Sequence, residues 1–427
     1  MAEEQEVILY TEEIKVSSTG DEIASKDWRW LFGVLVLSYA LLVSGSSFVL
    51  GISEHQALQG LGVAALDHPW MDLRGVAAWC DAWEKGNNPS AMQTIIIIPG
   101  ESKGFPNFLM NYSPLVLIFG KLGFSTNSVF IWGIFLFLIY AIALWILCGP
   151  CTLQQAFLWA LLICSPASVL VVERGNLDML IFVLLVSALL LRKNAIFESG
   201  IILTASLLKF YPILAILAPW LKQRGRGRLI VYMSILIFVL FLVIIRSRLT
   251  AIAGSLEGQF HSAFGYRVWA DLLTHSVVVI NAQSLHIIRL GSRIIALLGI
   301  SASFLLGFRA WRTTDRSLLS ERALHAFFLG APLLLVLFLQ GTQMDYKWIL
   351  FLLMVPASIE LTRSQNSLEV LCAKMWFYTI LAYSYWTFFS DEGSLRNAIL
   401  KQFLMWVGIF LSAFLAGRLW YRRDMLT

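Results

Sequence analysis

Apolar stretches of about 20 residues recur along this chain, and they restrict its fold more than any other feature. From Trp28 to the C-terminus, no soluble globular domain fits between them. The chain of 427 residues is 58% hydrophobic, with a mean hydropathy of +0.73, whereas soluble domains are about 45–50% apolar. A helix of about 20 apolar residues crosses a bilayer. The sequence therefore predicts an all-α, polytopic integral membrane protein whose main partner is the lipid bilayer.

The charge pattern excludes one class of partner and divides the chain. The net charge of +5 does not indicate a nucleic-acid-binding protein, because the basic residues lie in short loops between apolar stretches. Residues 1–26 are polar and acidic and lack the basic and apolar regions of a signal peptide. We expect a cytoplasmic N-terminal tail over 1–27 and a single transmembrane domain over 28–427.

The apolar stretches predict about 11–13 transmembrane or re-entrant helices. We place spans near 30–52, 127–147, 153–172, 176–191, 229–245, 293–308, 324–339, 346–361, 375–389 and 399–415. The segment 195–221 is ambiguous. As one span it would place the basic cluster 222–228 outside, against the positive-inside rule. As two short helices it forms a re-entrant hairpin, with Lys209-Phe210-Tyr211-Pro212 at its apex.

With that hairpin, the basic clusters all fall on the cytoplasmic side. Most remaining polar segments then share the extracytoplasmic side. They are the first loop at 53–111, which we expect to carry interfacial helices, the turn at 173–178, the long segment at 247–292, and the loops at 340–347 and 390–397. Scattered structural polar residues would not separate in this way.

Three ionisable groups and an amide interrupt the apolar sequence at Glu173, Arg174, Asn176 and Asp178. Ionisable groups near a membrane are costly and usually face a partner, a cavity or the interface. Lys209 also lies in apolar surroundings. It could extend to the cytoplasmic surface, but its place in the hairpin favours a partner, which could be Asp178, Glu173 or a ligand phosphate.

Other polar residues mark the loops on the same side. Asp72 in the first loop could activate an acceptor hydroxyl as a general base, or could simply cap a helix. Tyr112 opens the next apolar piece, and Asp345 and Lys347 lie in a turn that could be an ordinary interfacial one. The chain has no Walker A loop, no HExxH, no zinc-spaced Cys/His set and no Asp-X-Asp in the first loop. We therefore expect neither a metal nor a cofactor.

Five of these elements, taken in order, resemble a known family. They are Met71-Asp72-Leu73-Arg74 with Gly86-Asn87-Asn88-Pro89 downstream, Asn111-Tyr112-Ser113-Pro114, Glu173-Arg174-Gly175-Asn176-Leu177-Asp178, Lys209-Phe210-Tyr211-Pro212, and Asp345-Tyr346-Lys347. Together they are similar to the motifs of the GT-C membrane glycosyltransferases, above all glycosyltransferase family 87, which includes polyprenyl-phosphate-mannose-dependent mannosyltransferases. The resemblance spans residues 72–347.

The resemblance implies a GT-C-type bundle and an inverting transfer. The donor would be a polyprenyl-phosphate-linked sugar, mannose or another hexose or pentose, and the acceptor a glycan or glycolipid. Asp72 would be the general base, and the cations beside the lipid phosphate would be Lys209, Lys347 and Arg174. The side chains that orient them or the sugar would be Glu173, Asn176 and Asp178, and the motifs add Tyr112, Tyr211 and Asp345. The protein would lie in the bacterial inner membrane, with its site on the periplasmic face.

Two other functions fit a polar cluster in a membrane bundle. A transporter or flippase of a lipid-linked or small polar solute would also have broken helices and charges at membrane depth. A non-catalytic subunit that binds a sugar lipid would keep the same fold. Against transport, the two halves of the chain lack a matched pair of broken helices.

Overall fold

The computed structural model describes residues 27–89, 95–96, 105–106, 110, 112–246, 263–268, 282–310, 319–340, 343–386 and 395–420. The regular secondary structure of these residues is helical apart from two antiparallel pairings of two residues each. The strands are β1 (Ile95–Ile96) with β2 (Phe105–Pro106), and β3 (Ala263–Phe264) with β4 (Gln343–Met344). The predicted helical class is therefore confirmed with these two small exceptions. All but the last residue of the expected tail 1–27 lies outside the described residues.

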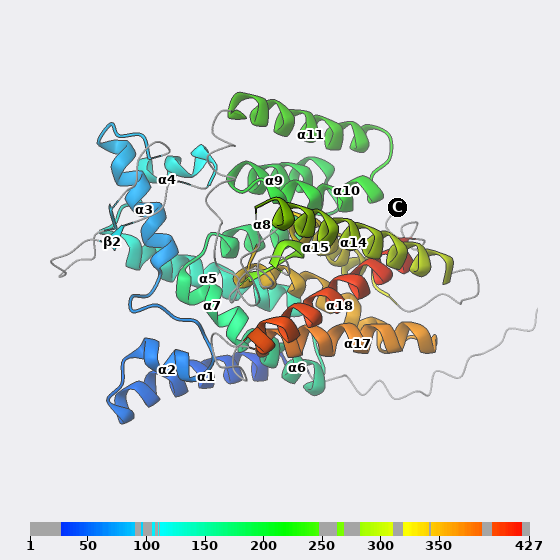
Figure 1. Cartoon of the computed structure of the whole chain (residues 1–427), viewed down its shortest axis with the longest axis horizontal. Coiled ribbons are helices and arrows are strands. Elements are labelled where there is room, and N and C mark those ends of the chain that lie inside the picture. The colour runs from blue at the N-terminus through cyan, green and yellow to red at the C-terminus, as the bar shows by residue number, and fades with distance from the viewer. Residues whose placement is uncertain are drawn as a thin grey trace, which may run out of the picture.

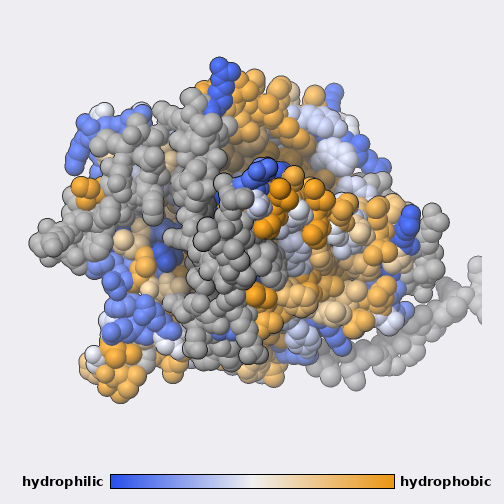
Figure 2. Space-filling view, in the orientation of Figure 1, coloured by the Kyte–Doolittle hydropathy of each residue, from blue (hydrophilic) through white to orange (hydrophobic). Residues whose placement is uncertain are grey.

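Among the described residues, five helices are long and apolar enough to cross a membrane, and a bent helix pair could add a sixth. The five are α5 (Val129–Cys148), α11 (Arg226–Ile244), α14 (Ala282–Arg309), α15 (Glu321–Leu339) and α18 (Leu395–Trp420). On the face shown in Figure 2, hydrophobic side chains gather over α11 and α14, and hydrophilic ones lie mainly toward the two ends. So much exposed apolar surface suits lipid contact. The structure thus agrees with an integral membrane protein, and the larger helix number and GT-C type stay predictions.

The bent pair replaces a span that the sequence predicted as one helix over 153–172. It consists of α6 (Leu153–Ile163) and α7 (Pro166–Arg174), which meet at 54°. Pro166 has no N–H to continue the α6 ladder. The Ser165 hydroxyl instead accepts a hydrogen bond from the Ser168 N–H and starts a new helix. The segment of the predicted span near 153–172 is therefore helical but bent at Ser165–Pro166.

The segment after α8 (Asp178–Leu190) folds back on itself. It runs through α9 (Ala195–Leu208), the 3₁₀ helix η2 (Tyr211–Ile216) and α10 (Leu217–Lys222). We call these three elements together the Lys209 hairpin. Arg192 before α9 and Lys222 at the end of α10 both contact Glu321 Oε1, at 3.5 and 2.5 Å. The two ends of the hairpin therefore lie together. Lys209 directly follows α9, so it lies one length of that helix from these two ends, about 20 Å at the rise of an α-helix.

The centre of the bundle is α15, whose buried face packs against η2, α18 and the 3₁₀ helix η5 (Asp345–Met354). The sequence predicted a span near 346–361. In the structure this segment is η5 followed directly by α16 (Val355–Leu361), and α17 (Ser367–Ser384) comes next. Farther out, α14 and α18 pack so closely that a Cβ on Gly307 would lie 2.0 Å from the Phe414 carbonyl oxygen. Such close packing through small residues is typical of membrane helices.

Short elements gather at one end of the bundle (Figure 1). After α1 (Arg29–Leu50) come α2 (Glu54–Gly60), α3 (Met71–Glu84), the 3₁₀ helix η1 (Pro114–Leu117) and α4 (Ile118–Lys121). Helix α3 runs across the direction of the long helices (Figure 1). The predicted loop 247–292 extends too far toward the C-terminus, because α14 already begins at Ala282. Of that loop, 247–262 and 269–281 lie outside the described residues.

The opposite end of the bundle holds paired basic side chains. The Arg29 guanidinium lies 5.4 Å from the centre of the Trp145 ring, and Arg322 donates a hydrogen bond to the Ile146 carbonyl oxygen. Glu321, which joins the two ends of the hairpin, is the neighbour of Arg322. The basic end and the end with α3 are therefore opposite ends of the same bundle.

Candidate functional site

The helix that carries Asp72 begins at a strained residue. Trp70 has φ 61°, and no other non-glycine residue of the described chain has a positive φ. This backbone conformation costs a non-glycine residue about 1–3 kcal/mol. The Trp70 N–H donates a hydrogen bond to the Glu173 carbonyl oxygen at 2.6 Å, and its ring packs against Gly133 and Phe130. These contacts compensate the strain and place the first turn of α3 against the turn between α7 and α8.

Gly175 lets this turn approach α3. It has φ +62°, and a Cβ there would lie 3.0 Å from the Cβ atoms of both Leu73 and Trp70. A side chain at this position would therefore push the two elements apart. The result of this close approach is that Asn176 reaches Asp72, which is 104 residues away in the sequence.

The Asn176 amide is fully buried and uses both of its ends. Its Nδ2 donates to Asp72 Oδ2 at 2.6 Å and lies 3.4 Å from the Tyr112 hydroxyl. Its Oδ1 accepts from Lys209 Nζ and from the Asp178 N–H, both at 2.9 Å. An ammonium and a backbone N–H can only donate, and an ionised carboxylate can only accept. The partners therefore determine which way the amide points.

Lys209 and Asp178 form an enclosed ion pair, with Nζ 2.7 Å from Oδ1 and side chains that are 6% and 0% exposed. The Tyr211 hydroxyl donates to the same Oδ1 at 2.5 Å. The other oxygen, Oδ2, is buried and accepts no hydrogen bond within the described part of the chain. We call Asp72, Tyr112, Asn176, Asp178, Lys209 and Tyr211 the site network.

Aromatic rings and a second lysine complete the cationic side of the network. Lys209 Nζ lies 4.5 Å from the centre of the Tyr112 ring, and Lys347 Nζ lies 5.4 Å from the centre of the Tyr211 ring. Such distances allow favourable cation–π contact. The predicted Lys347 therefore lies beside the network. Asp345 is the first residue of η5, but its side chain lies outside the described residues.

Glu173 and Arg174 lie beside the network and hold the linker that leads from α2 to α3. Glu173 Oε1 accepts from the Leu66 N–H at 3.0 Å, and Arg174 Nη2 donates to the Ala64 carbonyl oxygen at 3.3 Å. Arg174 Nε also lies 3.4 Å from Glu173 Oε2. These two predicted site residues therefore fix the path of the linker, and within the described part of the chain their side chains make no hydrogen bond to Asn176 or Lys209.

The two carboxylates of the network differ in access. Asp178 is fully buried and bound by Lys209 and Tyr211, whereas Asp72 is only half-buried and accepts one hydrogen bond. Burial raises the pKa of Asp72, and the charge of Arg174 and the hydrogen bond from Asn176 oppose that rise. A carboxylate with a raised pKa and an accessible oxygen is the better proton acceptor of the two.

The sequence missed two features of the structure. Trp70 carries no signal for a positive φ, because tryptophan rarely adopts it. The second is a buried pair far from Lys209, in which His325 Nε2 contacts Glu198 Oε1 and both side chains are 0% exposed. These residues lie 127 positions apart, so only the Glu in α9 and the His in α15 were visible as isolated polar residues in apolar segments.

In the described part of the chain, no three His, Cys, Asp or Glu side chains are grouped so that they could hold a metal ion. The network can instead offer an accessible carboxylate, one ammonium group and two tyrosines, with the ammonium group of Lys347 beside it. No protein-family model, curated protein or solved structure matches the chain.

Proposed function

We propose that this protein is an inverting GT-C-type glycosyltransferase. It would move a sugar from a polyprenyl-phosphate donor to a glycan or glycolipid on the extracytoplasmic side of the membrane. The observation that carries the proposal is the site network itself. Four of the five family-like motifs contribute side chains to one hydrogen-bonded cluster, through Asp72, Tyr112, Asn176, Lys209 and Tyr211. Lys347, from the fifth motif, lies beside it.

In the proposed reaction Asp72 takes the proton from the acceptor hydroxyl. The hydroxyl oxygen forms a bond to the anomeric carbon from the side opposite the phosphate, and the bond between that carbon and the phosphate oxygen breaks. Its electron pair leaves with the polyprenyl phosphate, so the configuration of the sugar inverts. The ammonium groups of Lys347 and Lys209 would stabilise the negative charge that develops on the phosphate.

Asp178 has a different role in this proposal. Its buried carboxylate holds Lys209 and Tyr211 in place, so it would position the cation without touching the acceptor. Asn176 would act as the link between the base and the cation, since its amide binds Asp72 and Lys209 at once.

Lipid-linked sugar profiling by mass spectrometry, in cells with and without the gene, tests this proposal. A transferase predicts that deletion depletes one glycosylated product and accumulates its unmodified acceptor. The wild-type gene should restore the product. An unchanged glycan pool together with altered uptake of a solute would refute the transferase.

One observation favours transport as a second candidate. The enclosed Glu198–His325 pair and the Lys209–Asp178 pair lie toward opposite ends of α9, and buried ionisable groups spaced along a broken helix are typical of transporters. Uptake into liposomes that contain the purified protein tests this candidate. Transport of a polar solute that Glu198→Gln abolishes would support it.

A further inference from the structure

The segment that precedes α1 has a charge opposite to that of the chain as a whole. Residues 1–26 contain seven Asp and Glu side chains and two Lys, whereas the whole chain has a net charge of +5. We call 1–26 the acidic segment. Its acids extend from Glu3 to Glu22, so the last of them lies five residues before Asp27. Five residues span at most about 18 Å, which keeps this carboxylate close to the start of the bundle.

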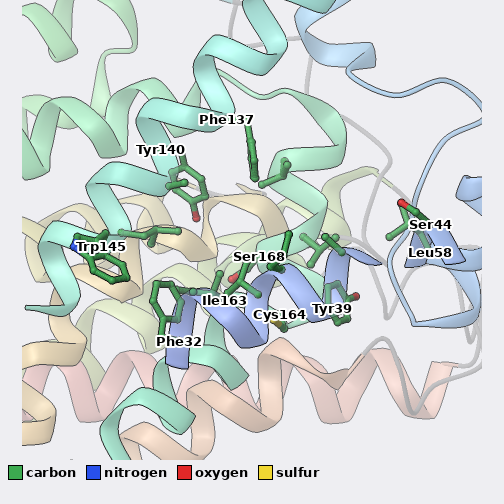
Figure 3. Close-up of a pocket in the computed structure, with 18 of the residues that line it drawn as sticks. Phe32, Tyr39, Ser44, Leu58, Phe137, Tyr140, Trp145, Ile163, Cys164 and Ser168 are labelled. Carbon is green, nitrogen blue, oxygen red and sulfur yellow. The ribbon is translucent and has the colours of Figure 1, made fainter. Parts of the chain in front are cut away.

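The acidic segment joins the bundle at its basic end. The Trp28 N–H donates to the Cys151 carbonyl oxygen at 3.0 Å, and the Cys151 N–H donates to Asp27 Oδ1 at 3.4 Å. The Phe32 ring lies beside the Trp145 ring, with 6.5 Å between the ring centres (Figure 3). These contacts hold the first turn of α1 against the end of α5, so the acidic segment leaves the bundle at this end.

A loop rich in arginine lies at the same end. From the last residue of α10 to the first turn of α11, four cations fall within seven residues that include no acid, namely Lys222, Arg224, Arg226 and Arg228. We call 222–228 the basic loop. Its three arginines are exposed. The basic loop therefore presents a concentrated positive charge.

The basic loop is close to the point where the acidic segment joins the bundle. Arg322 lies against the turn between α5 and α6, since a Cβ on Gly149 would be 3.1 Å from Arg322 Nη1. Its neighbour Glu321 contacts Lys222 at 2.5 Å. Two adjacent residues at the start of α15 therefore touch both the turn that binds the start of α1 and the first residue of the basic loop.

The described carboxylates near the basic loop are already engaged. Glu321 is held by the two cations at the ends of the Lys209 hairpin, and Glu360 accepts hydrogen bonds from the N-cap of α15. Within the described part of the chain, no carboxylate pairs with Arg226 or Arg228. Exposed charges attract one another over about 8 Å at physiological ionic strength. The basic loop can therefore bind further anions.

Two kinds of anion could meet this charge. Anionic lipid headgroups attract basic residues that lie at a membrane surface. The carboxylates of the acidic segment, however, are covalently attached beside the loop, and a short connection of this kind gives an effective concentration on the order of millimolar. The observations favour the acidic segment, because its charge is opposite and its attachment point is on the page of contacts that leads to Lys222.

We infer that the acidic segment 1–26 binds the basic loop 222–228 of its own chain, through ion pairs between its carboxylates and the three arginines. The bound segment would cover the ends of the Lys209 hairpin, at the opposite end of the bundle from the site network. This interaction requires no sugar transfer, so it does not depend on the proposed function.

The test uses the full chain in phosphatidylcholine nanodiscs that hold one chain each. A carbodiimide joins a carboxylate to a lysine amine that contacts it, and Arg226→Lys supplies such an amine in the basic loop without changing its charge. Mass spectrometry of the digested protein should find position 226 coupled to acids of the acidic segment. The yield should fall about fivefold or more in 1 M NaCl, where the Debye length drops from about 10 Å at 0.1 M to about 3 Å.

Arg246→Lys is the matched control, because it makes the same substitution at an exposed residue just after the other end of α11. It should give no coupling to the acidic segment. Adding Arg224→Gln and Arg228→Gln to Arg226→Lys should lower the yield, since it removes two of the three cations. Coupling at position 226 no stronger than at 246, or a yield that salt leaves unchanged, would overturn the inference. Retention of phosphatidylglycerol by the loop without coupling to the acidic segment would assign the loop to lipid and also overturn it.

Discussion

At the scale of single residues, the site depends on one amide. Asn176 donates to Asp72 and accepts from Lys209, so it can serve both only as an amide in one orientation. A carboxylate at this position would put two acceptor oxygens at the 2.6 Å separation that a hydrogen bond now spans. One of the two carboxyls would then have to keep a proton, which removes the base or its support.

We therefore predict that Asn176→Asp lowers the transfer rate at least about 100-fold, the size of a lost general base. Asn194→Asp is the matched control. The Asn194 side chain caps α9 by accepting from two backbone N–H groups, and an aspartate caps a helix equally well. Transfer assays on the two purified variants check this, and a rate for Asn176→Asp close to that of Asn194→Asp would contradict it.

The pH dependence of transfer follows from the environment of Asp72. A general base works deprotonated, so activity is complete above its pKa and is lost as the pH falls through it. Since burial raises the pKa of Asp72, we expect the acidic limb of kcat/KM above the usual aspartate value of about 3.9. The positive charge of Arg174 opposes this rise.

Arg174→Gln should therefore move the acidic limb of kcat/KM to higher pH. Arg74→Gln serves for comparison, because the Arg74 side chain binds the Pro69 carbonyl oxygen. It removes the same charge from α3, the helix that carries Asp72 itself, and should shift the limb less, because the charges that lower the pKa of Asp72 are those of Arg174 and Lys209. A limb that moves to lower pH in Arg174→Gln would contradict the charge placement.

The sequence predicted the residues of the network better than their contacts. Charges at Asp178 and Lys209 stand out because the residues around them are mostly apolar, whereas Asp72 lies in the polar first loop and was singled out by its motif. Asp178 was one of three partners expected for Lys209, and the structure pairs the two. The contact between Asp72 and Asn176 could not be read, since it depends on Gly175 and on the positive φ of Trp70, which bring segments 104 residues apart together. The partners of Glu173 and Arg174 were not visible either, because they are backbone atoms of a linker.

At the scale of elements, the Lys209 hairpin and α8 are joined by an enclosed ion pair. Lys209 ends α9 and Asp178 begins α8, and neither is appreciably exposed. Removing one partner of a buried pair leaves an uncompensated charge and costs about 3–5 kcal/mol, whereas removing both costs much less.

Lys209→Met should accordingly destabilise the protein strongly, and Asp178→Asn combined with Lys209→Met should recover much of the lost stability. The double variant should stay inactive, since it lacks the cation. Unfolding temperatures in detergent, with transfer assays on the same samples, measure both effects. If the double variant were no more stable than Lys209→Met, the pair would not be the coupling between these elements.

Element boundaries show why sequence reasoning succeeded for some helices and failed for others. Apolar length alone predicted α5 and α11 within a few residues. It missed the break at Ser165–Pro166, because a proline within an apolar run can either bend or end a helix. It also missed the 3₁₀ geometry of η5, which produces no distinct apolar pattern.

At the scale of the whole molecule, the bundle separates a basic end from the end that holds the site network. Lys222, Arg192 and Glu321 meet at the basic end, while Lys209 lies about 20 Å away across the hairpin. With basic residues on the cytoplasmic side, the network would face outward.

Cysteine labelling in intact cells tests this orientation. In a variant without the five native cysteines, a membrane-impermeant maleimide should react with Lys121→Cys at the end of α4 and not with Arg224→Cys after α10. Both residues are exposed, so both should react once the membrane is permeabilised. Reaction of Arg224→Cys in intact cells would refute the topology.

The most direct test of the central claim compares two aspartates that lie five residues apart. Asp72 is bound to Asn176 within the network, and Asp67 has a side chain that is 79% exposed. With a polyprenyl-phosphate sugar as donor, purified Asp72→Asn should lose about 100- to 10,000-fold in transfer rate while still binding the donor. Asp67→Asn should transfer at the wild-type rate. Normal transfer by Asp72→Asn would contradict the account.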